Sequence, residues 1–263
     1  MKILAIDTSG QQAGAAILAV SERSGSDNYI TIGEILLNAR TGENSWTHSE
    51  ILMPGIDSMF RLTGFDGMDG IDYVAYTSGP GSFTGLRIGA STALGLARGL
   101  NKQTIAVPTL DALAYNVLED SKIIVPMMDA RRGQVYFAIF LTPWTFNQSN
   151  TYASKPDITS HLIRATDYLA LPVGDAIDVL QNDVLKNADE NKRVIFLGDG
   201  ADAYRDEILA KMSTAQFAKP NLSRVRASSV GAWALDNLEK AQPPSGEVEI
   251  LYVRAPQAVR EKA

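Results

Sequence analysis

A glycine-rich segment that follows an apolar run constrains the fold of this chain more than any other part of the sequence. The apolar run 71–76 predicts a buried strand, and a helical pattern begins soon after it and extends to about Leu100. Between them, Gly79 and Gly81 flank Pro80, which is typical of a tight turn with an exposed backbone. A strand, a glycine turn and a helix in this order predict an α/β fold.

Small residues recur along this helix with a regular spacing. One set, spaced by four residues, lies on a single helical face: Gly85, Gly89, Ala93 and Ala97. A second set lies on roughly the opposite face: Ser91, Gly95 and Gly99. Because each interior glycine costs a helix about 1 kcal/mol relative to alanine, we expect close backbone approaches on both sides, one by the chain's own sheet and one by a second protein.

Two other interpretations of this helix are possible. It could be a central helix that is buried on both faces within one domain, and the sequence leaves that alternative open. A membrane-spanning helix is excluded, because Arg87 and Arg98 interrupt the segment and its apolar length falls short of about 20 residues.

Composition limits the classes of function. The net charge of −6 argues against a protein that grips a nucleic-acid backbone by itself. The basic pairs Arg131-Arg132 and Arg224/Arg226 are explained equally well by surface solvation. Without cysteine, the chain has no disulfide, thiolate nucleophile or cysteine-built metal site. The apolar run at the N-terminus is too short for a secretory signal, so we expect a cytoplasmic protein with no membrane contact.

Common catalytic and cofactor motifs are missing or incomplete. The two histidines, His48 and His161, are far apart and have no second histidine at ligand spacing, so we expect neither a metal site nor a cofactor. The loop 79–85 is neither a Walker A loop nor a dinucleotide fingerprint, although its backbone remains a weak candidate for anion binding. Residues 79–83 match only half of a hydrolase nucleophile elbow.

The order of elements repeats along the chain. In the first half we predict a helix after Trp46-Thr47 and strands at 2–6, 13–20, 30–38, 71–76 and 104–107. After Pro108 we predict helical segments at 110–118, 157–170, 175–187, 202–212 and 228–240, the last capped by Ser228. The strands expected there are 123–128, 135–141, 194–197 and 250–253, the last after a linker at 242–246. Each half begins with a strand that ends in aspartate, which predicts a duplicated α/β architecture with lobes 1–108 and 109–263.

Two aspartates and a glycine turn suggest a nucleotide site. Asp7 and Asp129 each end a strand that enters a hairpin, and Gly198 and Gly200 open a helix. The three elements resemble those that contact nucleotide in actin-like and sugar-kinase-like folds, where hairpin amides meet phosphates and a carboxylate meets hydrated Mg²⁺. Aspartates at strand ends are also ordinary turn residues, and the sequence leaves both interpretations open.

Several blocks, in this order, resemble the bacterial TsaB (YeaZ) family. They are residues 3–9, His48-Ser49-Glu50 with Leu52 and Pro54, residues 78–89, residues 129–136 and Tyr252-Val253-Arg254. The resemblance implies a two-lobed actin-like (ASKHA) fold with duplicated mixed sheets and flanking helices. It further implies a non-catalytic subunit that pairs with TsaD, in a complex that includes TsaE. That complex forms the threonylcarbamoyl group on N6 of adenosine 37 in tRNAs that read codons beginning with A. The chain would contact tRNA only indirectly and would form a homodimer when alone.

The same resemblance implies that the chain is not the catalytic member. Catalytic relatives carry a His-x-x-x-His metal motif, and Thr109 and Leu113 stand at the matching positions here. The partner interface is expected on two helices, at His48, Leu52, Ile56, Met59, Phe60, Gly85, Gly89, Ala93 and Ala97. The rival functions are an ATP-using phosphotransferase of the sugar-kinase type, a metalloprotease, and a free-standing homodimer with another role.

Overall fold

The computed structural model describes residues 1–20, 29–38, 46–65, 67–118, 122–142, 157–158, 162–187 and 193–253. They form two compact units. Unit 1 comprises Met1–Ala112 and Val225–Tyr252, and unit 2 comprises Leu113–Arg224 together with Val253. The units differ from the expected lobes because the segment 225–252 belongs to unit 1. The division into lobes 1–108 and 109–263 as independent folding domains stays a prediction.

The sheet of unit 1 has five strands. They are β1 (Lys2–Asp7), β2 (Gln12–Val20), β3 (Tyr29–Asn38), β4 (Tyr73–Gly79) and β5 (Gln103–Pro108). Their order is β3-β2-β1-β4-β5, with antiparallel pairs on the β3 side of β1 and parallel pairs on the β5 side. The central strand β1 is almost continuously apolar because both faces of the sheet are covered.

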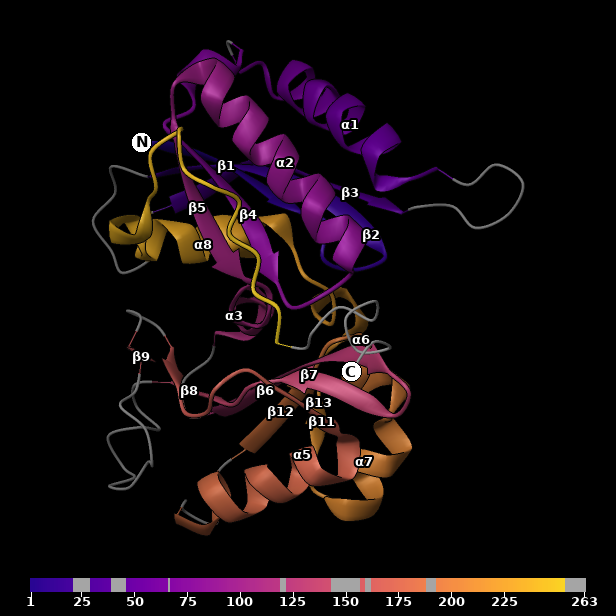
Figure 1. Ribbon diagram of the computed structural model, residues 1–263. Coiled ribbons are helices and arrows are strands. Elements are labelled where there is room, and N and C mark those ends of the chain that lie inside the picture. Colours follow the sequence, from indigo (N-terminus) through magenta and orange to yellow (C-terminus); the bar gives the residue numbers. More distant parts are fainter. Residues whose placement is uncertain are drawn as a thin grey trace, which may run out of the picture. The chain divides into compact units, whose positions relative to one another are not determined.

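Helices cover both faces of this sheet (Figure 1). On one face lie α1 (His48–Thr63) and α2 (Phe83–Leu100), and on the other lies α8 (Ala227–Asp236). Short 3₁₀ turns occur at Met68–Gly70 and Leu238–Lys240. The N-terminus of α1 is fixed by a capping box between Thr47 and Glu50, and Ser82 caps α2 by accepting a hydrogen bond from the Gly85 amide. The predicted strands and helices of the first half are confirmed.

The start of α8 is capped differently from the prediction. The helix begins at Ala227, so Ser228 lies inside its first turn. The amide and hydroxyl of Ser228 donate to Glu34 on β3, at 2.9 and 2.7 Å, and Arg226 pairs with the same carboxylate. Burial alone would raise the pKa of Glu34, but these hydrogen bonds outweigh it and lower the pKa. A carboxylate 194 residues away thus supplies the cap, a contact that local sequence cannot reveal.

The sheet of unit 2 repeats the pairing pattern of unit 1. Its strands are β6 (Lys122–Arg131), β7 (Gln134–Phe137), β8 (Phe140–Leu141), β9 (Asp157–Ile158), β10 (Ile163–Arg164), β11 (Leu169–Pro172), β12 (Arg193–Leu197) and β13 (Gln216–Phe217). The central β6 pairs antiparallel with β7, which in turn pairs antiparallel with β11. On the other side of β6 lies β12, which is parallel to β6 and pairs in parallel with β13. Strands β8, β10 and β9 extend the antiparallel side. The predicted α/β class with duplicated mixed sheets is confirmed.

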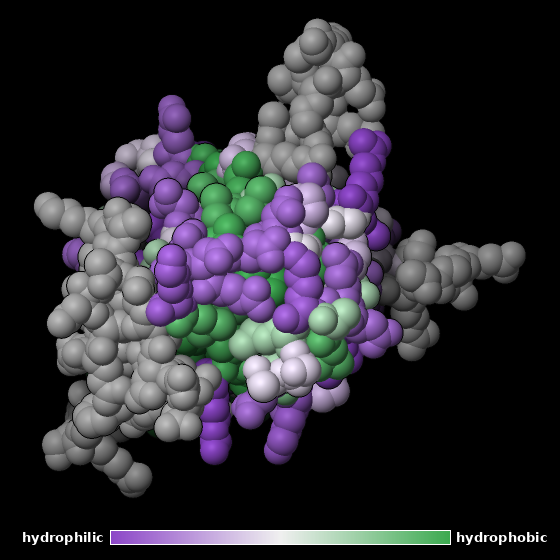
Figure 2. All heavy atoms as spheres, turned by 90° about the horizontal axis from the view of Figure 1, so that it is seen from below, coloured by the Kyte–Doolittle hydropathy of each residue, from purple (hydrophilic) through white to green (hydrophobic). Residues whose placement is uncertain are grey.

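The helices of unit 2 are short. They are α3 (Thr109–Ala114, which begins in unit 1), α5 (Val173–Val179), α6 (Asp199–Ala203) and α7 (Arg205–Lys211). Among the described residues, a π-helical turn at Leu180–Val184 and 3₁₀ turns at Tyr115–Val117, Leu185–Asn187 and Pro220–Leu222 accompany them. An exposed ion pair between Lys211 and Asp178 joins α7 to α5. Seen from below, the side on which Figure 1 draws α5 and α7, Figure 2 shows a broad hydrophilic band with hydrophobic side chains on both sides of it.

Two predicted elements are wrong. The helix expected at 157–170 is replaced, in its described residues, by β9, β10 and the start of β11, because pairing with β8 and β7 overrides a weak helical signal. The strand expected at 250–253 is absent, and residues 242–252 instead form a turn at Pro244 and Ser245 and then run as an irregular segment beside α2. None of the described helices is both long and apolar enough to cross a bilayer.

Candidate functional site

A cluster of buried polar groups lies where β1 ends in unit 1. Asp7 is only 3% exposed, and its Oδ1 accepts hydrogen bonds from the amide and hydroxyl of Ser9, at 3.0 and 2.7 Å, and from the Thr77 hydroxyl, at 2.9 Å. Burial raises the pKa of Asp7, and these bonds together with the charge of His48 offset the rise only in part. The cluster therefore holds a carboxyl group whose ionised form is disfavoured by its surroundings.

The first small-residue face of α2 packs on this same turn. The Thr8 hydroxyl donates to the Gly85 carbonyl oxygen at 2.7 Å. A Cβ at Gly85 would lie 2.1 Å from the Thr8 carbonyl oxygen, and one at Gly89 would lie 2.2 Å from the Thr8 hydroxyl. Ala93 and Ala97 continue the face into the apolar core of unit 1. The close approach that these residues permit is therefore made by the chain itself.

The glycine turn is held from two sides. The Ser82 amide donates to the Ser9 carbonyl oxygen at 2.7 Å, and the Gly79 amide donates to the Thr109 hydroxyl at 3.1 Å. Thr109, at the first position of the metal motif that the resemblance implies for catalytic relatives, thus has a structural partner here. Leu113, at the second position, is buried, and one of its methyl groups lies 3.0 Å from where a Cβ of Gly198 would be.

The predicted interface residues of α1 point inward as well. The apolar stripe of the helix is buried in the core of unit 1: Leu52, Ile56, Met59 and Phe60. His48 is half-buried, and its Nε2 lies 3.3 Å from the Gln11 carbonyl oxygen. This is a correction to the prediction, since an amphipathic helix on a sheet buries its apolar stripe against that sheet. The buried stripe anchors α1 on the sheet and leaves the opposite face of the helix exposed.

With the predicted residues of α1 and α2 packed inward, other residues of the two helices are exposed to solvent. On and beside α1, Trp46 is 53% exposed, Met53 39% and Leu62 86%. On α2, Ser91, Gly95 and Gly99 are exposed, and no atom lies within 4 Å of a Cβ built at either glycine. The second small-residue set in the sequence was the signal for this face, but the sequence alone did not show which set faces outward.

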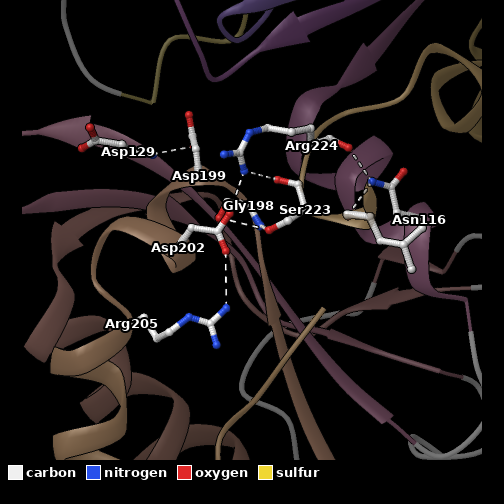
Figure 3. Close-up of polar contacts among 9 residues, drawn as sticks. Asn116, Asp129, Gly198, Asp199, Asp202, Arg205, Ser223 and Arg224 are labelled. Carbon is white, nitrogen blue, oxygen red and sulfur yellow. Dashed lines mark hydrogen bonds and ion pairs between the residues drawn. The ribbon is translucent and has the colours of Figure 1, made fainter. Parts of the chain in front are cut away.

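The remaining predicted residues gather in unit 2 (Figure 3). The Asp129 amide donates to Asp199 Oδ1 at 3.1 Å, and Asp129 Oδ1 accepts from the Arg131 amide at 2.8 Å. Gly198 has a φ of +107°, and a Cβ there would lie 2.0 Å from the Met127 carbonyl oxygen. Glycine is therefore required at 198 for the close packing of the β12–α6 turn on β6.

An ion-pair network surrounds this turn. Arg224 donates to Asp202 at 2.8 Å, and Arg205 lies 3.7 Å from the same carboxylate. Burial raises the pKa of Asp199, and the Asp129 amide and the Arg224 charge counter the rise in part. The sequence did not single out Asp199, although its place between two glycines at a strand end was a usable signal. Asp7 belongs to unit 1 and the others to unit 2, so a role for Asp7, Asp129, Gly198 and Gly200 in nucleotide contact stays a prediction.

Metal-binding geometry is missing from the part of the chain that the structure describes, where no three His, Asp or Glu side chains group as a metal site would require. His161 and Arg254, which the sequence singled out, lie outside the described residues.

Comparisons with known proteins agree with the resemblance. The model of the family described as "TsaD: tRNA N6-adenosine threonylcarbamoyltransferase" matches residues 42–251. The Haemophilus influenzae tRNA threonylcarbamoyladenosine biosynthesis protein TsaB is 27% identical over 97% of this chain and 94% of its own length. The Bacillus subtilis protein of the same name is 36% identical over 53% of this chain and 55% of its own length.

Solved structures show the same fold. YeaZ from Pseudomonas aeruginosa superposes with a TM-score of 0.65 at 18% identity, covering 95% of this chain and 99% of that one. A second P. aeruginosa structure, described as an uncharacterized protein with similarity to peptidase YeaZ, gives 0.66 at 18% identity, with coverage of 96% and 99%. The chain belongs to the family of the tRNA N6-adenosine threonylcarbamoyltransferases, and within it to the TsaB (YeaZ) proteins.

Proposed function

We propose that this chain is a non-catalytic subunit that pairs with a TsaD protein in the cytoplasm. In that role it supports formation of the threonylcarbamoyl group on N6 of adenosine 37 in tRNAs that read codons beginning with A. TsaE joins through the complex, and tRNA is contacted only indirectly. Family membership and the names of the relatives support the pathway. The negative net charge supports a protein that does not hold tRNA alone.

The observation that carries the proposal is the outward face of α1 and α2. Its α1 side exposes the large apolar side chains of Trp46 and Met53, of the kind enriched in protein interfaces, whereas Leu62, nine residues after Met53, projects from the opposite flank of the helix. Its α2 side is a bare row of small residues, Ser91, Gly95 and Gly99, which lets another helix approach to a short interaxial distance. We assign this face to a helix of TsaD, or to a second copy of the chain when TsaD is absent. The two assemblies exclude each other, because both use the same face.

The non-catalytic role is supported by what occupies the two positions of the metal motif. Thr109 offers a hydroxyl that already accepts the Gly79 amide, and Leu113 offers only an apolar side chain. The rival phosphotransferase activity needs a free carboxylate for hydrated Mg²⁺. Asp7 is buried, and one of its oxygens accepts three hydrogen bonds.

The experiment is add-back to a cell-free tRNA modification assay. A lysate depleted of this chain should lose threonylcarbamoyladenosine formation and regain it with the purified chain, which alone should form no product and turn over no ATP. The Asp7→Ala variant serves as the control for the rival phosphotransferase activity. Steady ATP turnover by the isolated chain that disappears in this variant would favour the phosphotransferase, and unchanged product formation in the depleted lysate would contradict the proposal.

A further inference from the structure

An irregular segment from Gln242 to Tyr252, which we name the strap, lies beside α2 on the α1–α2 side of the unit 1 sheet (Figure 1). Every residue of the strap is exposed or half-buried. It is held by a few directional contacts at its two ends and in its middle.

The first two anchors lie in the N-terminal part of the strap. Gln242 and Thr104 on β5 exchange two backbone hydrogen bonds, at 2.7 and 2.9 Å. The Arg98 guanidinium then donates to the carbonyl oxygens of Pro244 and Gly246, each at 3.1 Å. One side chain of α2 thus binds two successive points of the strap backbone, and such charged donors form stronger hydrogen bonds than neutral ones.

The third anchor joins the far end of the strap to the start of α2. The Leu251 amide donates to the Ser78 carbonyl oxygen at 2.7 Å, at the end of β4. The Tyr252 ring packs on Phe83 with centroids 5.6 Å apart, and Arg87 donates to the Tyr252 hydroxyl at 3.4 Å. Arg87 also stacks on Phe83, with its guanidinium 3.9 Å from the ring centroid. These contacts fix the glycine turn and the first turn of α2 together.

Helical periodicity places the strap next to the proposed partner face. Arg87 and Arg98 are eleven residues apart, which is close to three full turns, so both project from one flank of α2. The bare row that contains Ser91 and Gly95 lies immediately beside that flank. The strap therefore runs along one side of the exposed row of small residues on α2.

We propose that the strap is a clasp, which opens without unfolding unit 1 and which, when closed, holds the N-terminal turns of α2 in the form that a partner helix binds. Its residues bury little surface, and segments of that kind open at a lower free energy than the core around them. Opening releases Phe83 and Arg87 and uncovers the edge of β5 at Thr104. The part of this inference that concerns binding rests on the proposed function, whereas the part that concerns opening does not.

Hydrogen exchange measured by mass spectrometry tests the clasp in the full chain. In Arg98→Ala, Tyr252→Ala and the double variant, strap peptides and peptides from the first turns of α2 should exchange about tenfold faster, while peptides from β1 and β4 stay protected. Tyr252→Phe, which keeps the ring on Phe83, should have a smaller effect. The matched control is Lys211→Ala, which removes an exposed cation paired with Asp178 in unit 2, away from the strap contacts and from the outward face of α1 and α2. Faster exchange in the strap with unchanged exchange in α2 would overturn the clasp.

A binding measurement separates this inference from the proposed function. The strap variants should bind TsaD, or self-associate, about fivefold to tenfold more weakly than the wild type and the Lys211→Ala control. Unchanged binding in variants that have lost α2 protection would show that the clasp does not set affinity. If the wild type binds no TsaD and forms no dimer, the proposed function fails, and the exchange result still decides whether the clasp exists.

Discussion

Gly89 and Gly95 lie on the same helix in opposite surroundings. At Gly89 an added Cβ would lie 2.2 Å from the Thr8 hydroxyl, which is itself bonded to Gly85, so it cannot move away freely. At Gly95 an added Cβ would meet no atom within 4 Å. The sequence shows two small-residue rows, but only the position of the β1–β2 turn decides which row faces inward. For this reason the two helices were predictable from the sequence and their exposed residues were not.

The same substitution should therefore have opposite effects at these two positions. Gly89→Ala should lower the free energy of unfolding by about 1–3 kcal/mol, because it overpacks the Thr8 contact. Gly95→Ala should raise it by about 0.5–1 kcal/mol, because alanine favours the helix and meets no obstacle. Urea denaturation of both variants against the wild type measures the difference. Equal effects of the same sign would contradict the assignment of the two faces.

Asp7 gives a prediction about pH. Its pKa is raised in the folded chain from an ordinary value of 3.8, so folding favours the protonated carboxyl group. The contribution of Asp7 to stability is thus greatest at low pH and is lost as the pH rises from about 3.8 through the folded pKa.

Asp7→Asn keeps an oxygen for Ser9 and Thr77 and removes the charge. It should raise the melting temperature at pH 7, and the difference should shrink toward pH 4. Thermal melts between pH 4 and pH 8 measure this. A variant that is destabilised more at pH 7 than at pH 4 would show instead that the carboxylate is stabilising in its ionised form.

At the scale of the element, the N-terminus of α8 is capped by a residue of a strand rather than by the residue that precedes the helix. Glu34 on β3 accepts the amide and hydroxyl of Ser228 and pairs with Arg226. Since the pKa of Glu34 is lowered on folding, its stabilising contribution is present above the ordinary pKa of 4.5 and is lost as the pH falls through the folded value.

Glu34→Gln should therefore lower the free energy of unfolding at pH 7 by about 1 kcal/mol, the usual effect of losing a helix cap. The difference from the wild type should narrow as the pH falls below 4.5. Circular dichroism melts at pH 7 and pH 4 test this, with Glu50→Gln at the exposed α1 cap as a comparison. A loss of the same size at both values would indicate a packing role without linkage to the charge.

Elements with a strong local pattern were predictable, and those that depend on distant partners were not. The apolar runs of β1, β2 and β4 and the amphipathic pattern of α1 determine their own secondary structure. Strands β10 and β11 are two and four residues long and exist because β8 and β7 lie beside them. The strap has no regular hydrophobic pattern of its own. Its position is set by contacts with three separate elements, α2, β4 and β5.

At the scale of the whole molecule, both units use one pairing scheme. In each, a central strand has two antiparallel neighbours in series on one side and two parallel ones on the other. The two aspartates that the sequence singled out end the two central strands, or lie near that end, so the repeated hairpin signal was a reliable guide to the fold. The nucleotide contact that the same signal suggested stays a prediction, and the two aspartates have different neighbours, Thr77 for Asp7 and Tyr204 for Asp129.

The central claim is that the chain acts by pairing with TsaD through the outward face of α1 and α2. Light scattering during gel filtration of an equimolar mixture tests it most directly. Wild type should form a heterodimer, and so should the matched control Ala210→Arg, at an exposed small residue on α7. Gly95→Arg should fail to pair while keeping the melting temperature of the wild type, because the arginine projects from an open position into the space of the partner helix. A folded Gly95→Arg variant that pairs with TsaD as tightly as the wild type would contradict the account.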